Sequence, residues 1–165
     1  MATDPAAGLS IEAFDGTELD FWLGEWDARW GEVGRGTNRL TRILGGKVIR
    51  EEFSGGGANG HLEGLSLSVF DPARRLWQQT WVDDQGGYLD LVGDVVDGCF
   101  AFRRDAPEDG PATGKTLVGI YKIEGKVLTI CFTGTGGARP TEFKSGDRNT
   151  VLAVYERKEE VKSKK

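Results

Sequence analysis

Groups that bind metals are scarce in this sequence. It contains one histidine, His61, and two cysteines, Cys99 and Cys131. Four nitrogen or sulfur ligands are needed for a structural zinc site, and three such residues cannot supply them. Both cysteines lie in segments with a strand pattern, which argues against a cysteine–histidine nucleophile pair. We therefore expect no catalytic residue of these kinds, no metal site and no cofactor.

Long apolar runs and a basic stripe are also missing. No apolar run approaches the length of a membrane span, and the first eight residues have neither the positive nor the apolar region of a secretory signal. The net charge is -5, with a basic cluster only in the C-terminal tail, which argues against nucleic-acid binding. We expect a cytoplasmic protein, either a monomer or a homodimer. Its two cysteines are expected to be free thiols, with a Cys99–Cys131 disulfide as the alternative.

Glycine, by contrast, is abundant. The 25 glycines are spread along the chain at segment boundaries, which predicts many tight turns and many short strands. A hydrophobic content of 38% suits strands that expose every second side chain. The length predicts one domain, with a loose leader over 1–13, a β-barrel over 14–158 and a charged tail over 159–165.

Alternating segments between the turns predict about ten antiparallel strands. Asp97-Gly98 and Gly45-Gly46 are expected to be two-residue hairpin turns. Residues 55–60 are expected to form a flexible glycine-rich loop, to which we also assign His61, and 107–114 a polar loop. An up-and-down meander must hide its edge strands, so we expect a closed all-β barrel of about eight to ten strands. The expected strands are 25–32, 37–44, 47–53, 62–70, 75–83, 88–96, 99–104, 116–123, 127–133 and 150–157.

The segment from Phe21 to Trp30 is expected to form one end of the barrel. Gly24 would cost about 1 kcal/mol inside a helix, so we expect a short helical turn to end before it. After it, Trp26, Ala28 and Trp30 alternate with polar residues. This pattern predicts a first strand with one apolar face.

Gly24-Glu25-Trp26 resembles the Gly-x-Trp signature of the calycins, which include the lipocalins and fatty-acid-binding proteins. The resemblance implies an up-and-down barrel whose tryptophan packs against a basic side chain from the last strand. Arg157 stands at the matching position, so Trp26 and Arg157 are expected to form a structural end plug. A cation over an indole face contributes about 0.5–2 kcal/mol.

Two segments resemble smaller families. Residues 20–95, with Phe21-Trp22-Leu23-Gly24-Glu25-Trp26 and Trp77-Gln78-Gln79-Thr80-Trp81-Val82-Asp83, resemble a bacterial lipocalin-like family of unknown function, the DUF1579 type. Residues 114–158, with Arg139-Pro140-Thr141-Glu142-Phe143, are similar to a small domain frequent in Planctomycetes. Neither resemblance implies a catalytic residue. Together they imply parts of one barrel, and a natural, hybrid or designed origin stays open.

Two strand faces supply the candidate lumen residues. Trp77, Gln79 and Trp81 share one face, and a lumen with aromatic walls and one amide is typical of a small-molecule pocket. The alternative is a lumen that is packed shut. Arg50 and Glu52 share one face of their strand, and they form either an inward pair, which is costly unless it is satisfied, or an outward ion pair near the rim.

These patterns favour a barrel that binds a small hydrophobic or amphipathic molecule in its lumen without catalysis. One alternative is a barrel enzyme of the isomerase or lyase type, with Glu52, Tyr88 or Tyr121 as its acid or base. Another is a packed scaffold without a ligand. The candidate ligand-binding residues are Trp30, Arg50, Glu52, Trp77, Gln79, Trp81, Tyr88 and Tyr121.

Overall fold

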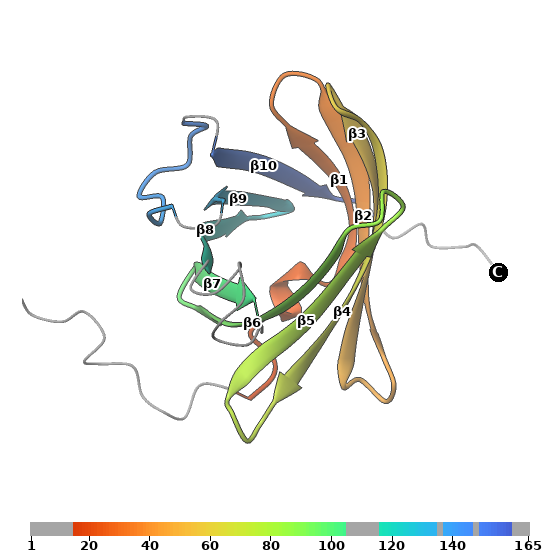
Figure 1. Cartoon of the computed structure of the whole chain (residues 1–165), viewed down its shortest axis with the longest axis vertical. Coiled ribbons are helices and arrows are strands. Elements are labelled where there is room, and N and C mark those ends of the chain that lie inside the picture. The colour runs from red at the N-terminus through yellow and green to blue at the C-terminus, as the bar shows by residue number, and fades with distance from the viewer. Residues whose placement is uncertain (1–14, 105–115, 135–136, 147–148, 160–165) are drawn as a thin grey trace, which may run out of the picture.

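The computed structural model describes residues 15–104, 116–134, 137–146 and 149–159. Its ten strands form a closed antiparallel barrel, in which each strand pairs with its sequence neighbours and the first pairs with the last (Figure 1). The strands are β1 (Gly24–Trp30), β2 (Gly34–Ile43), β3 (Val48–Gly57), β4 (Gly60–Asp71), β5 (Leu76–Asp83), β6 (Tyr88–Val96), β7 (Cys99–Arg104), β8 (Thr116–Glu124), β9 (Val127–Thr133) and β10 (Thr150–Arg157). The predicted all-β, up-and-down barrel is confirmed.

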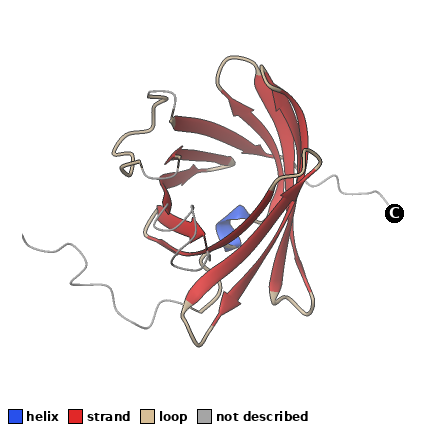
Figure 2. Cartoon of the chain, viewed as in Figure 1, coloured by secondary structure: helices blue, strands red, loops and turns tan. Residues whose placement is uncertain are grey.

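One short 3₁₀ turn, η2 (Asp20–Trp22), is the helical element of the described residues (Figure 2). It ends before Gly24, as the sequence predicts. Within the described ranges, no helix has the length and apolar character needed to cross a membrane. The predicted leader, the predicted loop at 107–114 and most of the predicted tail lie outside the described residues.

Four strands, β6, β7, β9 and β10, have the predicted bounds. The turn between β6 and β7 shows why such boundaries can be predicted. Asp97 and Gly98 have φ angles of 47° and 77°, which are the left-handed conformations of a two-residue hairpin turn. The turn between β2 and β3 differs from the prediction, because it spans residues 44–47 and starts with Leu44 at φ 49°.

The glycine-rich segment at 55–60 is not a loop, and this prediction was wrong. β3 continues to Gly57 and β4 begins at Gly60, so the turn consists of residues 58–59 and His61 lies in a strand. The glycines occupy these strand positions for a steric reason. A Cβ atom added at Gly55 would lie 2.8 Å from the indole of Trp30, so the bare backbone here makes room for a large ring.

Three large rings lie in a row across this side of the barrel interior. The ring centres of Trp30 and Phe53 are 5.8 Å apart, and those of Phe53 and Trp81 are 6.3 Å apart. Glycines of the intervening strands lie beneath them, because a Cβ atom at Gly36 or at Gly64 would touch the ring of Trp30 or of Trp81, respectively. The glycines therefore provide volume for the rings as well as turns.

One end of the barrel is closed by η2 and the side chains beside it. The guanidinium carbon of Arg157 lies 4.4 Å from the centre of the Trp26 ring, so the expected contact is present. The same guanidinium donates a hydrogen bond to the carbonyl oxygen of Phe21 at 2.9 Å, and the indole N–H of Trp26 donates to the carbonyl oxygen of Trp22 at 2.9 Å. These bonds fix η2 against β1 and β10.

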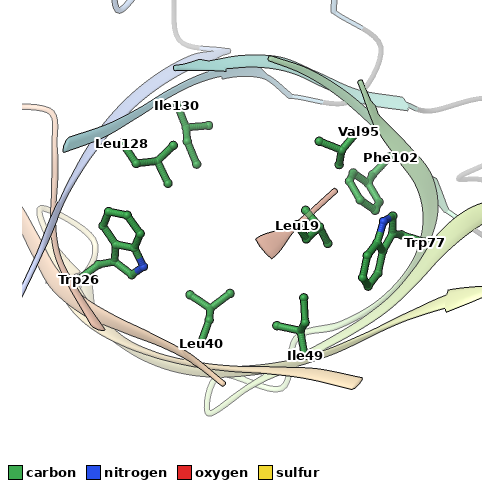
Figure 3. Close-up of a cluster of buried hydrophobic side chains, with 9 residues drawn as sticks. All are labelled: Leu19, Trp26, Leu40, Ile49, Trp77, Val95, Phe102, Leu128 and Ile130. Atoms are coloured by element: carbon green, nitrogen blue, oxygen red, sulfur yellow. The ribbon is translucent and has the colours of Figure 1, made fainter. Parts of the chain in front are cut away.

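The residues before and within η2 are held from the other side of the barrel as well. Arg42 forms an ion pair with Asp20, and the indole N–H of Trp77 donates to Oε2 of Glu18 at 3.1 Å. Between these anchors the side chain of Leu19 enters the core, where Figure 3 shows it inside a ring of side chains that point inward from the wall. The buried cluster consists of Leu19, Trp26, Leu40, Ile49, Trp77, Val95, Phe102, Leu128 and Ile130.

Both cysteines are free thiols, as expected. Cys131 is buried although it lies in β9 on the face opposite to Ile130, because its sulfur contacts the carbonyl oxygen of Lys144 at 3.5 Å. The connection between β9 and β10 therefore covers part of the outer wall.

Substitution of Gly36 tests the steric role of the interior glycines. A Cβ atom there would lie 2.6 Å from the carbonyl oxygen of Ser54, which is backbone and cannot move aside. We expect G36A to lower the free energy of unfolding by about 1–3 kcal/mol, as is typical of overpacking. Urea denaturation followed by circular dichroism measures the effect.

Gly57 provides the control, because a Cβ atom there would find its nearest neighbour at 3.4 Å, an ordinary contact. We expect G57A to leave the unfolding free energy unchanged or slightly higher. Equal destabilisation by the two substitutions would contradict the steric account.

Substitution of Arg157 tests the end plug. R157M removes the cation from the Trp26 ring and the donor from the carbonyl oxygen of Phe21, and we expect it to lower the free energy of unfolding by about 1–3 kcal/mol. The control is R39M, because Arg39 is 53% exposed and its ion pairs with the described residues Glu25 and Glu52 lie on the surface. If thermal and urea unfolding show the same small loss for both variants, the plug does not stabilise the barrel.

Candidate functional site

A cavity of about 370 Å³ lies inside the barrel. Side chains of the plug line it at one end, Phe21 and Trp22 among them, and Phe53 and Trp81 line it farther along β3 and β5. Nine of its twenty lining residues are aromatic, and Glu51 is the charged residue among the described lining residues. The cavity is therefore an apolar space with one ionisable carboxyl group.

Glu51 is the centre of a small polar cluster. Its side chain is buried, and both carboxyl oxygens accept hydrogen bonds, at 2.8 Å from Nδ2 of Asn38 in β2 and at 2.6 Å from Oγ of Ser66 in β4. Nε2 of Gln79 in β5 donates to the same Ser66 oxygen at 3.3 Å. Four neighbouring strands thus hold one carboxyl group in place.

Burial raises the pKa of Glu51 above its usual value of 4.5, because the apolar surroundings disfavour the charged form. The hydrogen bonds from Ser66 and Asn38 oppose this effect, since they stabilise the carboxylate. The pKa of Tyr155, which also lines the cavity, is raised by burial and by the negative charge of Glu51. The carboxyl group therefore keeps its proton to higher pH than an exposed glutamate does.

Two buried polar atoms, one beside Glu51 and one in the plug, have no hydrogen-bond partner among the described residues. One is Oδ1 of Asn38, whose side chain is 1% exposed, and the other is Nε1 of Trp22 in the plug. Buried polar groups are nearly always paired, by protein or by ordered water. Trp22 lines the cavity, so its indole N–H is a place where a bound molecule gains a hydrogen bond, whereas Asn38 is not part of the cavity lining.

Of the predicted lumen residues, the structure places Gln79, Trp81 and Tyr121 on the cavity wall. The ring of Tyr121 stacks on that of Phe21 with centres 4.2 Å apart. Trp77 is 1% exposed and belongs to the buried core, and Trp30 packs against Phe53 in the row of rings. These five candidates are brought to the barrel interior.

Arg50, Glu52 and Tyr88 do not line the cavity, which corrects the sequence-based assignment. Nη2 of Arg50 lies 3.1 Å from Oε2 of Glu52, with both side chains more than a third exposed, and Tyr88 is 59% exposed. Strand alternation explains this outcome, because Ile49 and Glu51 take the inner face of β3. The outward ion pair is the correct one of the two interpretations.

Glu51, Asn38 and Ser66 were missed as site residues. A signal for Glu51 exists in the sequence, since it alternates with Ile49 and Phe53, and the face with two large apolar residues is the inner one. Nothing in the sequence shows that Asn38 and Ser66 meet it, because these contacts depend on the pairing of three strands.

A cluster of Ser54, His61 and Glu63 resembles a catalytic triad in composition only. Nε2 of His61 lies 2.7 Å from Oε1 of Glu63 and 3.5 Å from Oγ of Ser54, so the carboxylate and the hydroxyl compete for one nitrogen. In a triad they bind opposite nitrogens of the ring. The described residues also contain no group of histidine, cysteine and acidic side chains arranged to hold a metal ion.

Comparison of the chain with protein-family models and with curated proteins finds no match in either. The closed antiparallel barrel is consistent with a calycin-like fold. The resemblances of residues 20–95 and 114–158 to smaller families gain no support from these comparisons.

The buried carboxyl group predicts a pH dependence of stability. The folded protein holds the Glu51 proton to higher pH than the unfolded chain does. The contribution of protonated Glu51 to the free energy of unfolding is therefore fully present below about pH 4.5, and it is lost as pH rises through the pKa of Glu51 in the folded state. E51Q keeps the shape of the protonated group without its titration. We expect the free energy of unfolding of E51Q to rise relative to that of the wild type as pH increases. The difference grows by about 1.4 kcal/mol for each pH unit over which Glu51 is ionised in the unfolded chain but not in the folded protein.

Urea denaturation across the range from weakly acidic to weakly basic pH measures this gap. E52Q is the matched control, because Glu52 is the outward-facing neighbour in β3. Parallel stability curves for the wild type and E51Q would show that Glu51 is not desolvated in solution.

Proposed function

We propose that this protein binds a small hydrophobic or amphipathic molecule in its lumen, in the manner of a lipocalin-like barrel and without catalysis. The observation that carries the proposal is the cavity of about 370 Å³ with mostly apolar walls and a few polar groups. Small-molecule sites have this composition, and their volumes start at about 300 Å³.

The arrangement of β4 supports a lumen made for a ligand over a packed core. The inner face of β4 carries the small residues Ser66 and Ser68, which are buried, whereas Leu65, Leu67 and Val69 on the outer face are 36–42% exposed. A barrel stabilised only by its core would bury the larger side chains. The small inner side chains of β4 instead leave part of the barrel interior unfilled.

Further proposals concern the family relationship, the location and the oligomeric state of the protein. The Gly-x-Trp sequence with the Arg157 contact supports a calycin relationship, and the two smaller resemblances remain proposals within it. Two free thiols fit a reducing compartment, so we propose a cytoplasmic location. The proposed oligomeric state is a monomer or a homodimer.

A second candidate function, a barrel enzyme with an acid or base in the lumen, is favoured by one observation. Glu51 brings a carboxyl group with a raised pKa into a cavity, which is the usual setting of a general acid or base. Of the sequence-based candidates for this role, Tyr121 lines the cavity, whereas Glu52 and Tyr88 face outward. Turnover of a substrate by the wild type and not by E51Q would favour this function.

Filling the cavity tests the proposed function. The neutral fluorescent probe N-phenyl-1-naphthylamine is expected to bind the wild type with saturable enhancement of its emission. S68F places a ring in the cavity, and we expect at least about tenfold weaker binding because the space is lost.

L67F is the matched control, since Leu67 is the next residue of β4 and lies on the outer face at 42% exposure. It is expected to bind the probe like the wild type. No saturable binding to the wild type, or equal losses in both folded variants, would contradict binding in the lumen.

A further inference from the structure

Glu51 is the charged residue among the described residues that line the cavity, and its ionised carboxyl group is an acceptor of hydrogen bonds. Glu51 offers two carboxyl oxygens, and Oδ1 of Asn38 beside it has no partner among the described residues. Nδ2 of Asn38 and Oγ of Ser66 each donate one hydrogen bond to Glu51, and Nε2 of Gln79 donates to Ser66. Each carboxylate oxygen can accept more than one hydrogen bond, so a ligand with an N–H donor can add a bond to Glu51.

The same cluster carries no compensating positive charge. The described residues that line the cavity include no arginine or lysine. Arg157, at the plug, is already engaged with the ring of Trp26 and with the carbonyl oxygen of Phe21. Without an opposite charge, burial favours the protonated form of Glu51, and a bound cation would supply the charge that favours the carboxylate.

The rest of the wall suits the body of a cationic molecule. Nine aromatic side chains line the cavity, among them Phe53, Trp81 and Tyr155. Aromatic faces attract cations as well as apolar groups, and the attraction is stronger away from water. An anionic ligand would instead place its oxygens near a carboxyl group without meeting a cation.

On the basis of the proposed lumen site, we infer that the ligand is a small hydrophobic amine. Its ammonium group donates to the Glu51 carboxylate, and its apolar body lies among the aromatic side chains. Asn38 and Ser66 are positioning residues, since their hydrogen bonds hold the two carboxyl oxygens in place. Fatty acids, which carry the opposite charge, are excluded from this position.

Three probes that share one skeleton test the charge preference. The probes are 4-phenylbutylamine, 4-phenylbutan-1-ol and 4-phenylbutyrate, each titrated at neutral pH against the wild type with displacement of N-phenyl-1-naphthylamine as the signal. We expect the amine to bind at least about tenfold more tightly than the alcohol, and the carboxylate more weakly than both. This order tests the proposal without any substitution.

Two variants locate the preference. E51Q is expected to bind the alcohol like the wild type and to lose the preference for the amine. E52Q changes the neighbouring outward-facing residue and is expected to keep the preference, because Glu52 is paired with Arg50 outside the lumen.

The outcomes separate this inference from the proposed function. Equal binding of amine and alcohol, tightest binding of the carboxylate, or an amine preference that survives in E51Q would overturn the amine assignment while lumen binding stands. If neither the fluorescent probe nor any of the three compounds binds, the proposed function fails with it.

Discussion

Closure of the sheet is the constraint on which the other features of this protein depend. Pairing of β1 with β10 joins residues far apart in sequence, with Trp26 opposite Arg157 in the register. Because the ring is closed, each of the ten described strands has one face toward a shared interior and a neighbour on both sides. The plug then closes one end, since Arg157 reaches both the indole of Trp26 and the backbone of Phe21.

The interior that results is only partly a hydrophobic core. Around the plug it is filled by residues such as Leu19 and Trp77, whereas farther along the strands small residues and large rings share the space. Glu51 lies between these two regions, where Asn38 and Ser66 each donate a hydrogen bond to one of its oxygens. The volume and the polar group thus come from the same strands, which is why the interior is the natural candidate site.

The sequence predicts the fold better than it predicts the site. Turns such as Asp97-Gly98 have strong local signatures, so the bounds of β6 and β7 follow from residues close together in the chain. The facing of β3 is harder to predict, because Arg50 and Glu52 place charge on one face and Glu51 places it on the other. The glycines of 55–57 were misread for a related reason, since the ring of Trp30 that requires them belongs to another strand. Site residues that meet through strand register leave no local signal.

The up-and-down topology also means that the strand pairings do not depend on which strand comes first in the chain. Every described neighbour other than the β1–β10 pair is adjacent in sequence, and β10 ends beside the start of β1. A circular permutant that links the end of β10 to the residues before η2 and opens the chain at Asp97-Gly98 would therefore retain all ten strand pairings. The cyclic order of the strands, and not the position of the termini, defines this architecture.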